Sequence, residues 1–239
     1  MSDQFQYAPA IVLNKHKRYE DGRIVPINIY GSSANQGTSI YVKPIHSLFD
    51  VGVDFEKLIP IKNEIDVIMI SHGHSDHLNW HTLQSLTQGR PDLTILLPDK
   101  IQVPLEFQSL LPHIIWAINH KTIQMTLRNG TNLQIEPVKV PHGHETTMSY
   151  VITFMTANLL FSTDLSSTKP LPHNLKFDLI LLEMNYDADA FVNTEGSGGA
   201  VNHLSVQEGM NYATTHLNEY GHIIPLHFGP TLTNFNQLH

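Results

Sequence analysis

The sequence predicts an α/β fold in which two β-sheets pack face to face and helices cover their outer sides. Three observations support this prediction. Strand patterns come mainly in runs, with helical patterns inserted between them instead of alternating regularly. The 239 residues can bury a sizeable core. No linker or shift of composition divides the chain, so we expect one domain over residues 1–239.

The elements are expected in the following order. Strands are predicted at 24–30, 38–42, 65–70, 93–97, 121–127, 133–140, 149–154, 159–162, 177–183 and 223–226, because these segments are apolar or alternate in polarity. Asn129 and Gly130 form a typical hairpin turn between the fifth and sixth of these strands. Helices are predicted at 55–58, 77–88, 105–110 and 205–220. The last helix has Ser205 as its N-cap and Glu208 three positions later.

Composition excludes several classes of protein. The chain has no Cys, which rules out disulfides, Cys₄ zinc modules, iron–sulfur clusters and a cysteine nucleophile. Neither a secretory signal nor an apolar run long enough to span a membrane is visible, so we expect a cytoplasmic protein without a membrane partner. The formal net charge of −8 argues against binding long nucleic acid.

Histidine clusters indicate a metal site. The chain has 16 His, and the apolar strand 65–70 runs directly into the motif His72-x-His74-x-Asp76-His77. Imidazole and carboxylate donors together suit zinc, manganese or iron better than magnesium or calcium. The alternative, a solvated His-rich loop, is disfavoured because further donors also follow apolar strands: His142 and His144, Asp164, and His227.

These motifs resemble the metallo-β-lactamase-fold hydrolases, and in particular their phosphodiesterase branch, which includes class II cyclic-nucleotide phosphodiesterases and tRNase Z. The segments Gly31–Thr38 and Leu48–Gly52 are similar to the opening strands and first Asp motif of that family. The resemblance implies a four-layered αβ/βα sandwich. Asp50 would then support the metal loop, with the capping of a local turn as the alternative.

The resemblance also implies two divalent metal ions, with zinc preferred and manganese or iron as alternatives. His72, His74 and either His142 or His144 would bind the first ion. Asp76, His77 and His227 would bind the second, and Asp164 would bridge both. We favour His142 over His144 because the corresponding ligand in related phosphodiesterases stands several residues before a Ser-Tyr or Gly-Tyr pair that starts the next strand. Here His142 lies eight positions before Tyr150 of Ser149-Tyr150.

Three residues are predicted to be catalytic: Asp76, His203 and Glu183. His203 precedes the predicted helix 205–220, next to the Gly-rich loop 193–200. In related phosphodiesterases a similarly placed His gives a proton to the departing oxygen. Glu183 ends a strand and is expected to accept a hydrogen bond from His203 and fix its tautomer. The alternatives are a structural His203 at a helix start and a solvent-facing Glu183.

The predicted activity is therefore hydrolysis of a small nucleotide phosphodiester, with a cyclic nucleotide as the leading substrate. Lys43, Lys139 or Arg128 could contact such an anion. Transfer-RNA processing is disfavoured because no compact Lys/Arg cluster is present. The alternatives are a carbon-centred hydrolase (lactonase, thioesterase or β-lactamase), a single-strand exonuclease, and a metal-stabilised binding scaffold. A homodimer is a further possibility that no local feature demonstrates.

Overall fold

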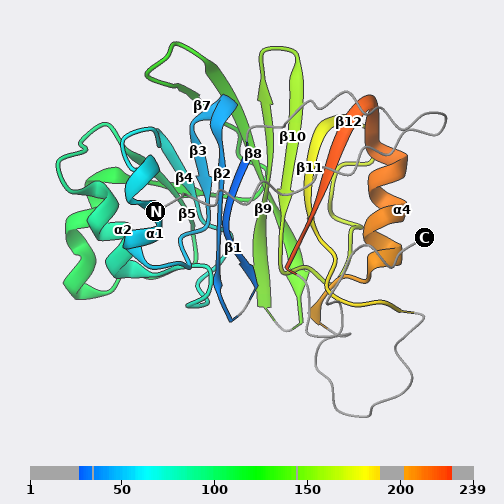
Figure 1. Ribbon diagram of the computed structural model, residues 1–239, viewed down its shortest axis with the longest axis horizontal. Coiled ribbons are helices and arrows are strands. Elements are labelled where there is room, and N and C mark those ends of the chain that lie inside the picture. The colour runs from blue at the N-terminus through cyan, green and yellow to red at the C-terminus, as the bar shows by residue number, and fades with distance from the viewer. Residues whose placement is uncertain (1–26, 34, 144, 189–201, 228–239) are drawn as a thin grey trace, which may run out of the picture.

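The computed structural model describes residues 27–33, 35–143, 145–188 and 202–227, and these form two six-stranded sheets. The sheets face each other in the centre of the molecule, with α1 and α2 beside one sheet and α4 beside the other (Figure 1). The predicted α/β sandwich with four layers is thereby confirmed.

The first sheet has the order β1-β2-β3-β4-β5-β6. Its strands β3 to β6 are parallel to one another, and β1 and β2 are antiparallel additions at one edge. Short helices connect the strands and pack outside the sheet. The strands are Ile27–Ser33, Gly37–Val42, Ser47–Phe49, Val67–Met69, Thr94–Pro98 and Ile114–Ala117, and the helices are α1 Phe55–Leu58, α2 Trp80–Thr87 and the 3₁₀ segments η1 Lys43–Ile45, η2 Ile59–Ile61 and η3 Leu105–His113.

The second sheet has the order β12-β11-β10-β9-β8-β7. Strands β10, β11 and β12 are parallel, and β7, β8 and β9 form antiparallel hairpins. Both sheets therefore combine a parallel half with an antiparallel half. The strands are β7 Ile123–Thr126, β8 Asn132–His142, β9 Glu145–Phe154, β10 Ala157–Ser162, β11 Phe177–Glu183 and β12 Leu217–Leu226, and the helix is α4 Val206–His216.

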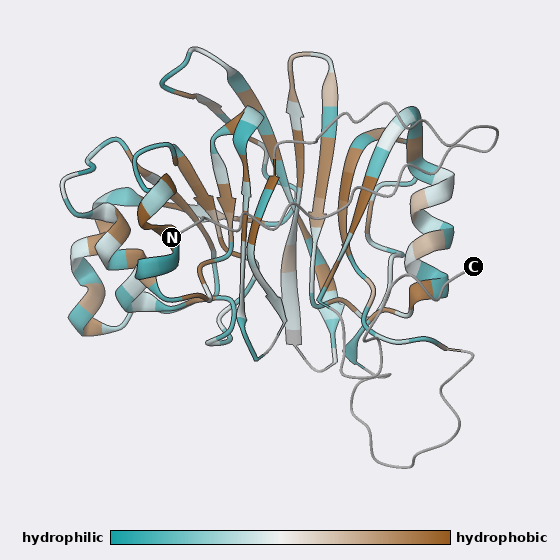
Figure 2. Cartoon of the chain, viewed as in Figure 1, coloured by the Kyte–Doolittle hydropathy of each residue, from teal (hydrophilic) through white to brown (hydrophobic). Residues whose placement is uncertain are grey.

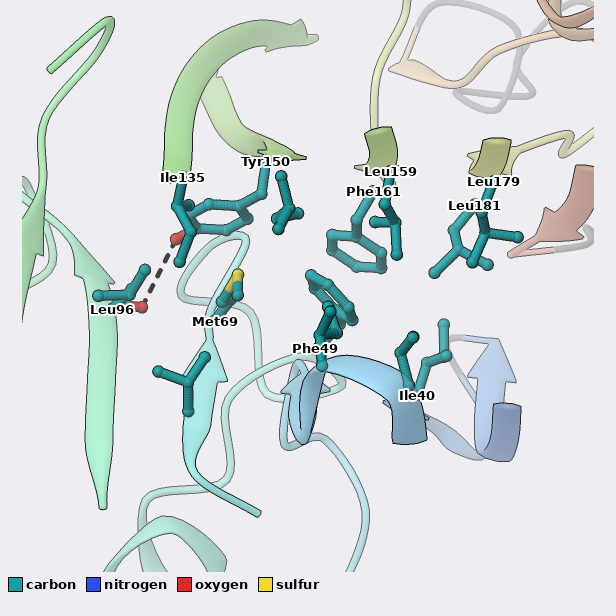
Figure 3. Packing of buried hydrophobic residues seen from close by; sticks show 14 of the residues in the cluster. Ile40, Phe49, Met69, Leu96, Ile135, Tyr150, Leu159, Phe161, Leu179 and Leu181 are labelled. Carbon is teal, nitrogen blue, oxygen red and sulfur yellow. Dashed lines mark hydrogen bonds between the residues drawn. The ribbon is translucent and has the colours of Figure 1, made fainter. Parts of the chain in front are cut away.

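The main core lies between the sheets (Figure 3). Phe49 of β3 stacks on Phe161 of β10 with ring centroids 4.5 Å apart, and both side chains are fully buried. Two further clusters lie on the outer faces, one under α2 and η3 and one under α4. Strands β4, β5 and β11 are covered on both faces and are consequently mostly apolar (Figure 2).

Three predictions of secondary structure need correction. Strands β3 and β6 were not expected, because three or four residues carry too little periodic pattern to be recognised. The helix predicted over 205–220 ends at His216, since Leu217 continues as a strand paired with Phe177 of β11. The helix predicted over 77–88 begins only at Trp80, where the Asn79 side chain caps it by accepting from the Thr82 N–H.

Some predictions fall outside the described residues: the start of the strand at 24–30, the Gly-rich loop 193–200, and His144 as alternative metal ligand. Within the part of the chain that the structure describes, no helix combines the length and apolarity needed to cross a bilayer.

Candidate metal centre

The loop after β4 carries the first set of donors, His72, His74, Asp76 and His77. Backbone hydrogen bonds hold this loop in place. The His77 N–H donates to the carbonyl of His74 over 2.9 Å, and the Thr38 N–H donates to the carbonyl of Asp76 over 2.6 Å. The loop is thus fixed both within itself and against β2.

The side chain of Asp50 holds this loop in place through three contacts. Its fully buried carboxylate accepts from the Ser71 backbone N–H (2.7 Å) and the Ser71 hydroxyl (2.8 Å) and contacts Nδ1 of His77 (2.7 Å). These partners lie at least 21 residues away, so the alternative role of capping a local turn is excluded. Because a carboxylate can only accept here, Nδ1 of His77 carries a proton, which leaves Nε2 as the ring nitrogen that could bind a metal ion.

The second sheet supplies donors from four separate strand ends. His142 is the last residue of β8, Asp164 follows β10, Glu183 is the last residue of β11, and His227 follows β12. Asp164 and His227 have φ angles of 49° and 53°. Such left-handed conformations are uncommon for residues other than Gly, and they are often kept where function requires a particular side-chain direction.

The two sets meet in three groups of side chains whose possible ligand atoms all lie within 4.8 Å of one another. One group contains His72, His74, His142 and Asp164, and another contains Asp76, His77 and His227. The third combines Asp164 and His227 with Glu183 and His203. All nine residues predicted for the site therefore converge. The metal-binding role of seven of them and the catalytic role of His203 and Glu183 stay predictions.

The donor atoms fit a metal ion. Within the described residues, Nε2 of His72, Nε2 of His77, Nε2 of His227 and Oδ1 of Asp164 are buried without a hydrogen-bond partner. Nε2 of His77 and Nε2 of His72 lie 3.0 and 3.2 Å from Oδ2 of Asp164, yet neither contact has hydrogen-bond geometry. Buried polar atoms left unpaired are costly, and metal ions bound in this cluster would satisfy all four.

The electrostatics of the cluster also favour a cation. Burial raises the pKa of Asp164, but the contacts with His72 and His77 outweigh it and hold that pKa well below its usual value. Burial lowers the pKa of His72, which keeps this imidazole neutral, the form that binds metals. For His227 burial acts in the same direction, but Asp76, Glu183 and Asp164 raise its pKa to about 10. A proton on His227 thus offsets carboxylate charge that a metal ion would neutralise.

His203 and Glu183 form a close pair at the edge of this cluster. Nδ1 of His203 lies 2.5 Å from Oε1 of Glu183, so the predicted hydrogen bond is confirmed. The side chain of His203 is 18% exposed and that of Glu183 is fully buried. The other carboxylate oxygen accepts from the Leu165 N–H over 2.8 Å. A solvent-facing Glu183 is therefore excluded.

Cationic side chains are arranged differently from the expectation. Arg128 pairs with Asp66 at the beginning of β4, whereas the donors follow the end of that strand, so Arg128 is not available to a substrate. Lys139 pairs with Asp99 over 3.2 Å and lines a pocket of about 150 Å³ beside His72. Lys100, which sequence reasoning missed, lines the same pocket. An exposed Lys after a strand carries no signal that separates it from other surface lysines.

Two asparagines are further residues that the sequence did not reveal. The Asn202 backbone carbonyl accepts from Nδ1 of His142 over 2.9 Å. The Asn185 side-chain amide donates to the carbonyl of His227 over 2.8 Å. A backbone acceptor leaves no trace in the identity of the residue that provides it, so only the folded chain reveals such a contact.

Comparison with known proteins places this site in a family context. Residues 46–228 match the family described as the β-lactamase superfamily domain. The metallo-β-lactamase-fold protein YhfI from Bacillus subtilis superposes with a TM-score of 0.62 at 21% identity, covering 85% of this chain and 86% of that one. Human tRNase Z, short form, superposes with a TM-score of 0.61 at 13% identity, covering 87% and 96%.

A curated relative matches over a shorter region. Cytidine monophosphate-N-acetylneuraminic acid hydroxylase of Mus musculus is 34% identical over 82 residues. This match covers 30% of the chain and 14% of the hydroxylase. The match therefore spans a small part of that protein.

Proposed function

The chain belongs to the β-lactamase superfamily and has the metallo-β-lactamase hydrolase fold, and on that basis we propose that it hydrolyses a phosphodiester bond in a small nucleotide. A cyclic nucleotide is the leading substrate. The observation that carries the proposal is the His203–Glu183 pair, because departure of an alkoxide requires a proton donor, whereas the thiolate released from a thioester leaves without one.

Some of these side chains would bind metal ions, and others would transfer protons. His72, His74, His142 and Asp164 would hold one divalent ion, preferably zinc. Asp76, His77 and His227, again with Asp164, would hold a second. When bound, such ions supply an activated water at neutral pH and charge compensation for the phosphoryl oxygens. Asp76 would also contribute negative charge to this site.

The proton donor is His203. Its Nδ1–H is held by Oε1 of Glu183, so its Nε2 is the nitrogen that can deliver a proton to the leaving oxygen. Glu183 is itself fixed by the Leu165 N–H and by Nδ1 of His227, which lies 3.2 Å from the same oxygen Oε1. The Glu183 carboxylate thus contacts both His203 and the predicted metal ligand His227. It therefore holds the ring of the proton donor in a fixed position before the substrate binds.

A small substrate is supported by charge and by the pocket beside His72. The net charge of −8 offers no basic track for a polynucleotide. The pocket of about 150 Å³ has Lys100 and Lys139 on its wall next to a predicted metal ligand. A pocket of this size admits only a small group, and a cationic side chain on its wall can meet the substrate phosphate.

The test is removal of the donor. We expect His203→Ala to lower turnover of 2′,3′- or 3′,5′-cyclic nucleotides by about 10²–10⁴-fold without a change of metal content. Glu183→Gln should lower turnover less, because the amide still orients the ring. The control is Glu136→Gln, which alters a similar pair with His120 (2.8 Å) on an exposed surface and should have no effect.

Loss of metal in His203→Ala would instead make His203 a ligand, as its grouping with Asp164 and His227 allows. Unchanged turnover in that variant would favour the carbon-centred hydrolases. The wild-type protein, loaded with zinc or manganese, should therefore also be assayed against linear dinucleotides, a lactone and a β-lactam. Preference for linear substrates would favour the exonuclease.

A further inference from the structure

The end of β8 contacts the segment that precedes α4, and this contact connects a predicted metal ligand with the predicted proton donor. His142 ends β8, and its Nδ1 donates to the backbone carbonyl of Asn202 over 2.9 Å. The next residue after Asn202 is His203, whose ring centroid lies 5.1 Å from that of His142. One residue therefore links a predicted metal ligand to the predicted proton donor.

Gly143 makes this contact possible. It has a φ angle of +57°, and a Cβ atom placed on it would lie 2.2 Å from Oδ1 and 2.8 Å from Cγ of Asn202. Real Cβ atoms do not approach other atoms so closely, so a side chain at position 143 would force the Asn202 side chain to move. Gly130, in the β7–β8 turn, also has a positive φ of +85°, but no atom lies within 4 Å of its Cβ position. Gly143 combines a positive φ with this close approach, whereas Gly130 has the positive φ alone.

We propose that Gly143 is a positioning residue that sets the distance between His142 and His203. The absence of a side chain lets Asn202 pack against the turn. The Asn202 carbonyl then fixes the tautomer of His142, with Nε2 directed to the cluster, and places His203 beside Glu183. The part of this inference that concerns proton delivery rests on the proposed function, whereas the part that concerns His142 does not.

The contact between His142 and Asn202 can be altered only by changing the distance between the two residues. The acceptor is a backbone carbonyl, which no substitution of Asn202 removes. The donor is the ring of His142, and replacing it would also remove a predicted ligand. A methyl group at position 143 would displace the Asn202 side chain, Cγ included, and we expect the carbonyl of the same residue to shift with it. All predicted ligands and the proton donor stay chemically intact.

The experiment compares Gly143→Ala with Gly130→Ala, which carries a comparable strain of the left-handed backbone without the close contact. In the zinc-loaded protein, Gly143→Ala should lower zinc affinity by about 10-fold, in the range seen when the outer partner of a metal-bound His is lost. The ring N–H signal of His142 in NMR spectra should shift. Gly130→Ala should match the wild type in both measurements.

A second readout concerns His203. With phosphodiesters, Gly143→Ala should lower turnover of an alkyl ester about 10–100-fold more than turnover of a p-nitrophenyl ester, because an aryl oxide leaves without help from an acid. If the wild type cleaves no phosphodiester, the proposed function fails, but zinc affinity and the His142 signal still decide on the role of Gly143.

Asn202→Ala provides the matched rescue. It removes the side-chain atoms that the new methyl would meet and keeps the carbonyl. The double variant Gly143→Ala/Asn202→Ala should recover most of the zinc affinity lost in Gly143→Ala, a coupling that independent sites do not show. The double variant also decides the case in which Gly143→Ala alone does not fold. Wild-type behaviour of Gly143→Ala, or a double variant as defective as Gly143→Ala, would overturn the proposal.

Discussion

The two sheets contribute to the candidate site in different ways. The first sheet provides a contiguous loop of six residues, His72 to His77, held from below by the side chain of Asp50. The second sheet provides single residues from the ends of β8, β10, β11 and β12, spread over 86 positions from His142 to His227. One half of the site is thus local in sequence, and the other exists only because four strands end at one edge.

This difference predicts different responses to change. In the first half a carboxylate supports the ligand loop, so one substitution can remove the support of several groups. In the second half, Nδ1 of His142 is held by the backbone carbonyl of Asn202, which survives substitution of that residue. Asp164 is the residue at which both halves meet.

The largest effect is expected from Asp164→Ala. Its carboxylate lies 3.2 Å from His72, 3.0 Å from His77 and 3.1 Å from His227, so its removal affects both halves at once. Turnover should fall by about 10⁴-fold or more, and bound metal per chain, measured by elemental analysis, should decrease. Asp92→Ala, at an exposed ion pair with Arg90, is the control and should behave as the wild type. Full metal content in Asp164→Ala would show that the two halves bind metal independently.

A smaller effect is expected on the pH dependence of stability when the second half of the site holds no metal ion. The pKa of His227 is raised from 6.5 to about 10, because the carboxylates Asp76, Glu183 and Asp164 outweigh burial. A raised folded-state pKa contributes stability that is complete below pH 6.5 and is lost as the pH rises through about 10. In chelator-treated protein we expect this contribution, about a few kcal/mol, to disappear over that window.

Thermal unfolding from pH 6 to pH 10 measures this contribution. The His227→Asn variant, treated with the same chelator, should show a weaker dependence on pH, although His77 has a raised pKa as well. Zinc-loaded wild type should also depend less on pH in this range, because the ion replaces the proton. An identical decline in all three samples would assign the effect to other groups.

The first half is tested by Asp50→Asn. The amide would present N–H groups to the Nδ1–H of His77, so His77 would have to move its proton to Nε2 and lose the lone pair that could bind a metal ion. We expect zinc affinity to fall by about 10–100-fold. Asn185→Ala, which removes the amide donor to the His227 carbonyl in the second half, should cost less. Equal losses would mean that both halves depend on side-chain support to the same degree.

The same contrast explains what the sequence could predict. The first half of the site can be recognised from the sequence, because four donors directly follow a strand that is recognisable by its apolar run. These donors are His72, His74, Asp76 and His77. His142, Asp164 and His227 were found because a donor after an apolar strand is a weaker form of the same pattern. Asn202 and Gly143 could not be found, since a backbone acceptor and a close approach depend on where the chain returns after 60 residues.

The fold shows the same limit. Long apolar strands such as β8 and β11 were expected within two residues of their observed bounds. Strand β3 was missed, although its end carries Asp50, because three residues define no period. The end of α4 was misplaced because pairing of Leu217 with Phe177 overrides local helix propensity, which is worth only tenths of a kcal/mol per residue.

The smallest predicted effect concerns a direct link between the halves. The Tyr150 hydroxyl of β9 donates to the carbonyl of Ile70 over 2.7 Å, two residues before His72. The Tyr150 side chain is fully buried, and its hydroxyl also lies 3.5 Å from the carbonyl of Leu96 (dashed line in Figure 3). Tyr150→Phe leaves the Ile70 carbonyl with less support and should lower the free energy of unfolding by about 1–2 kcal/mol. The change is measured by urea unfolding of the zinc-loaded protein.

The matched control stays within the first sheet. The Tyr41 hydroxyl reaches the carbonyl of Glu64 only at 3.4 Å, a long and weak hydrogen bond, so Tyr41→Phe should cost less than Tyr150→Phe. Zinc affinity should be unchanged in both variants, because Asp50, and not Ile70, fixes the loop that carries the ligands. If Tyr150→Phe weakened zinc binding without lowering stability, the second sheet would position the first-sheet ligands as well. The two halves would then form one support, and the contrast between a locally held loop and dispersed strand ends would no longer hold.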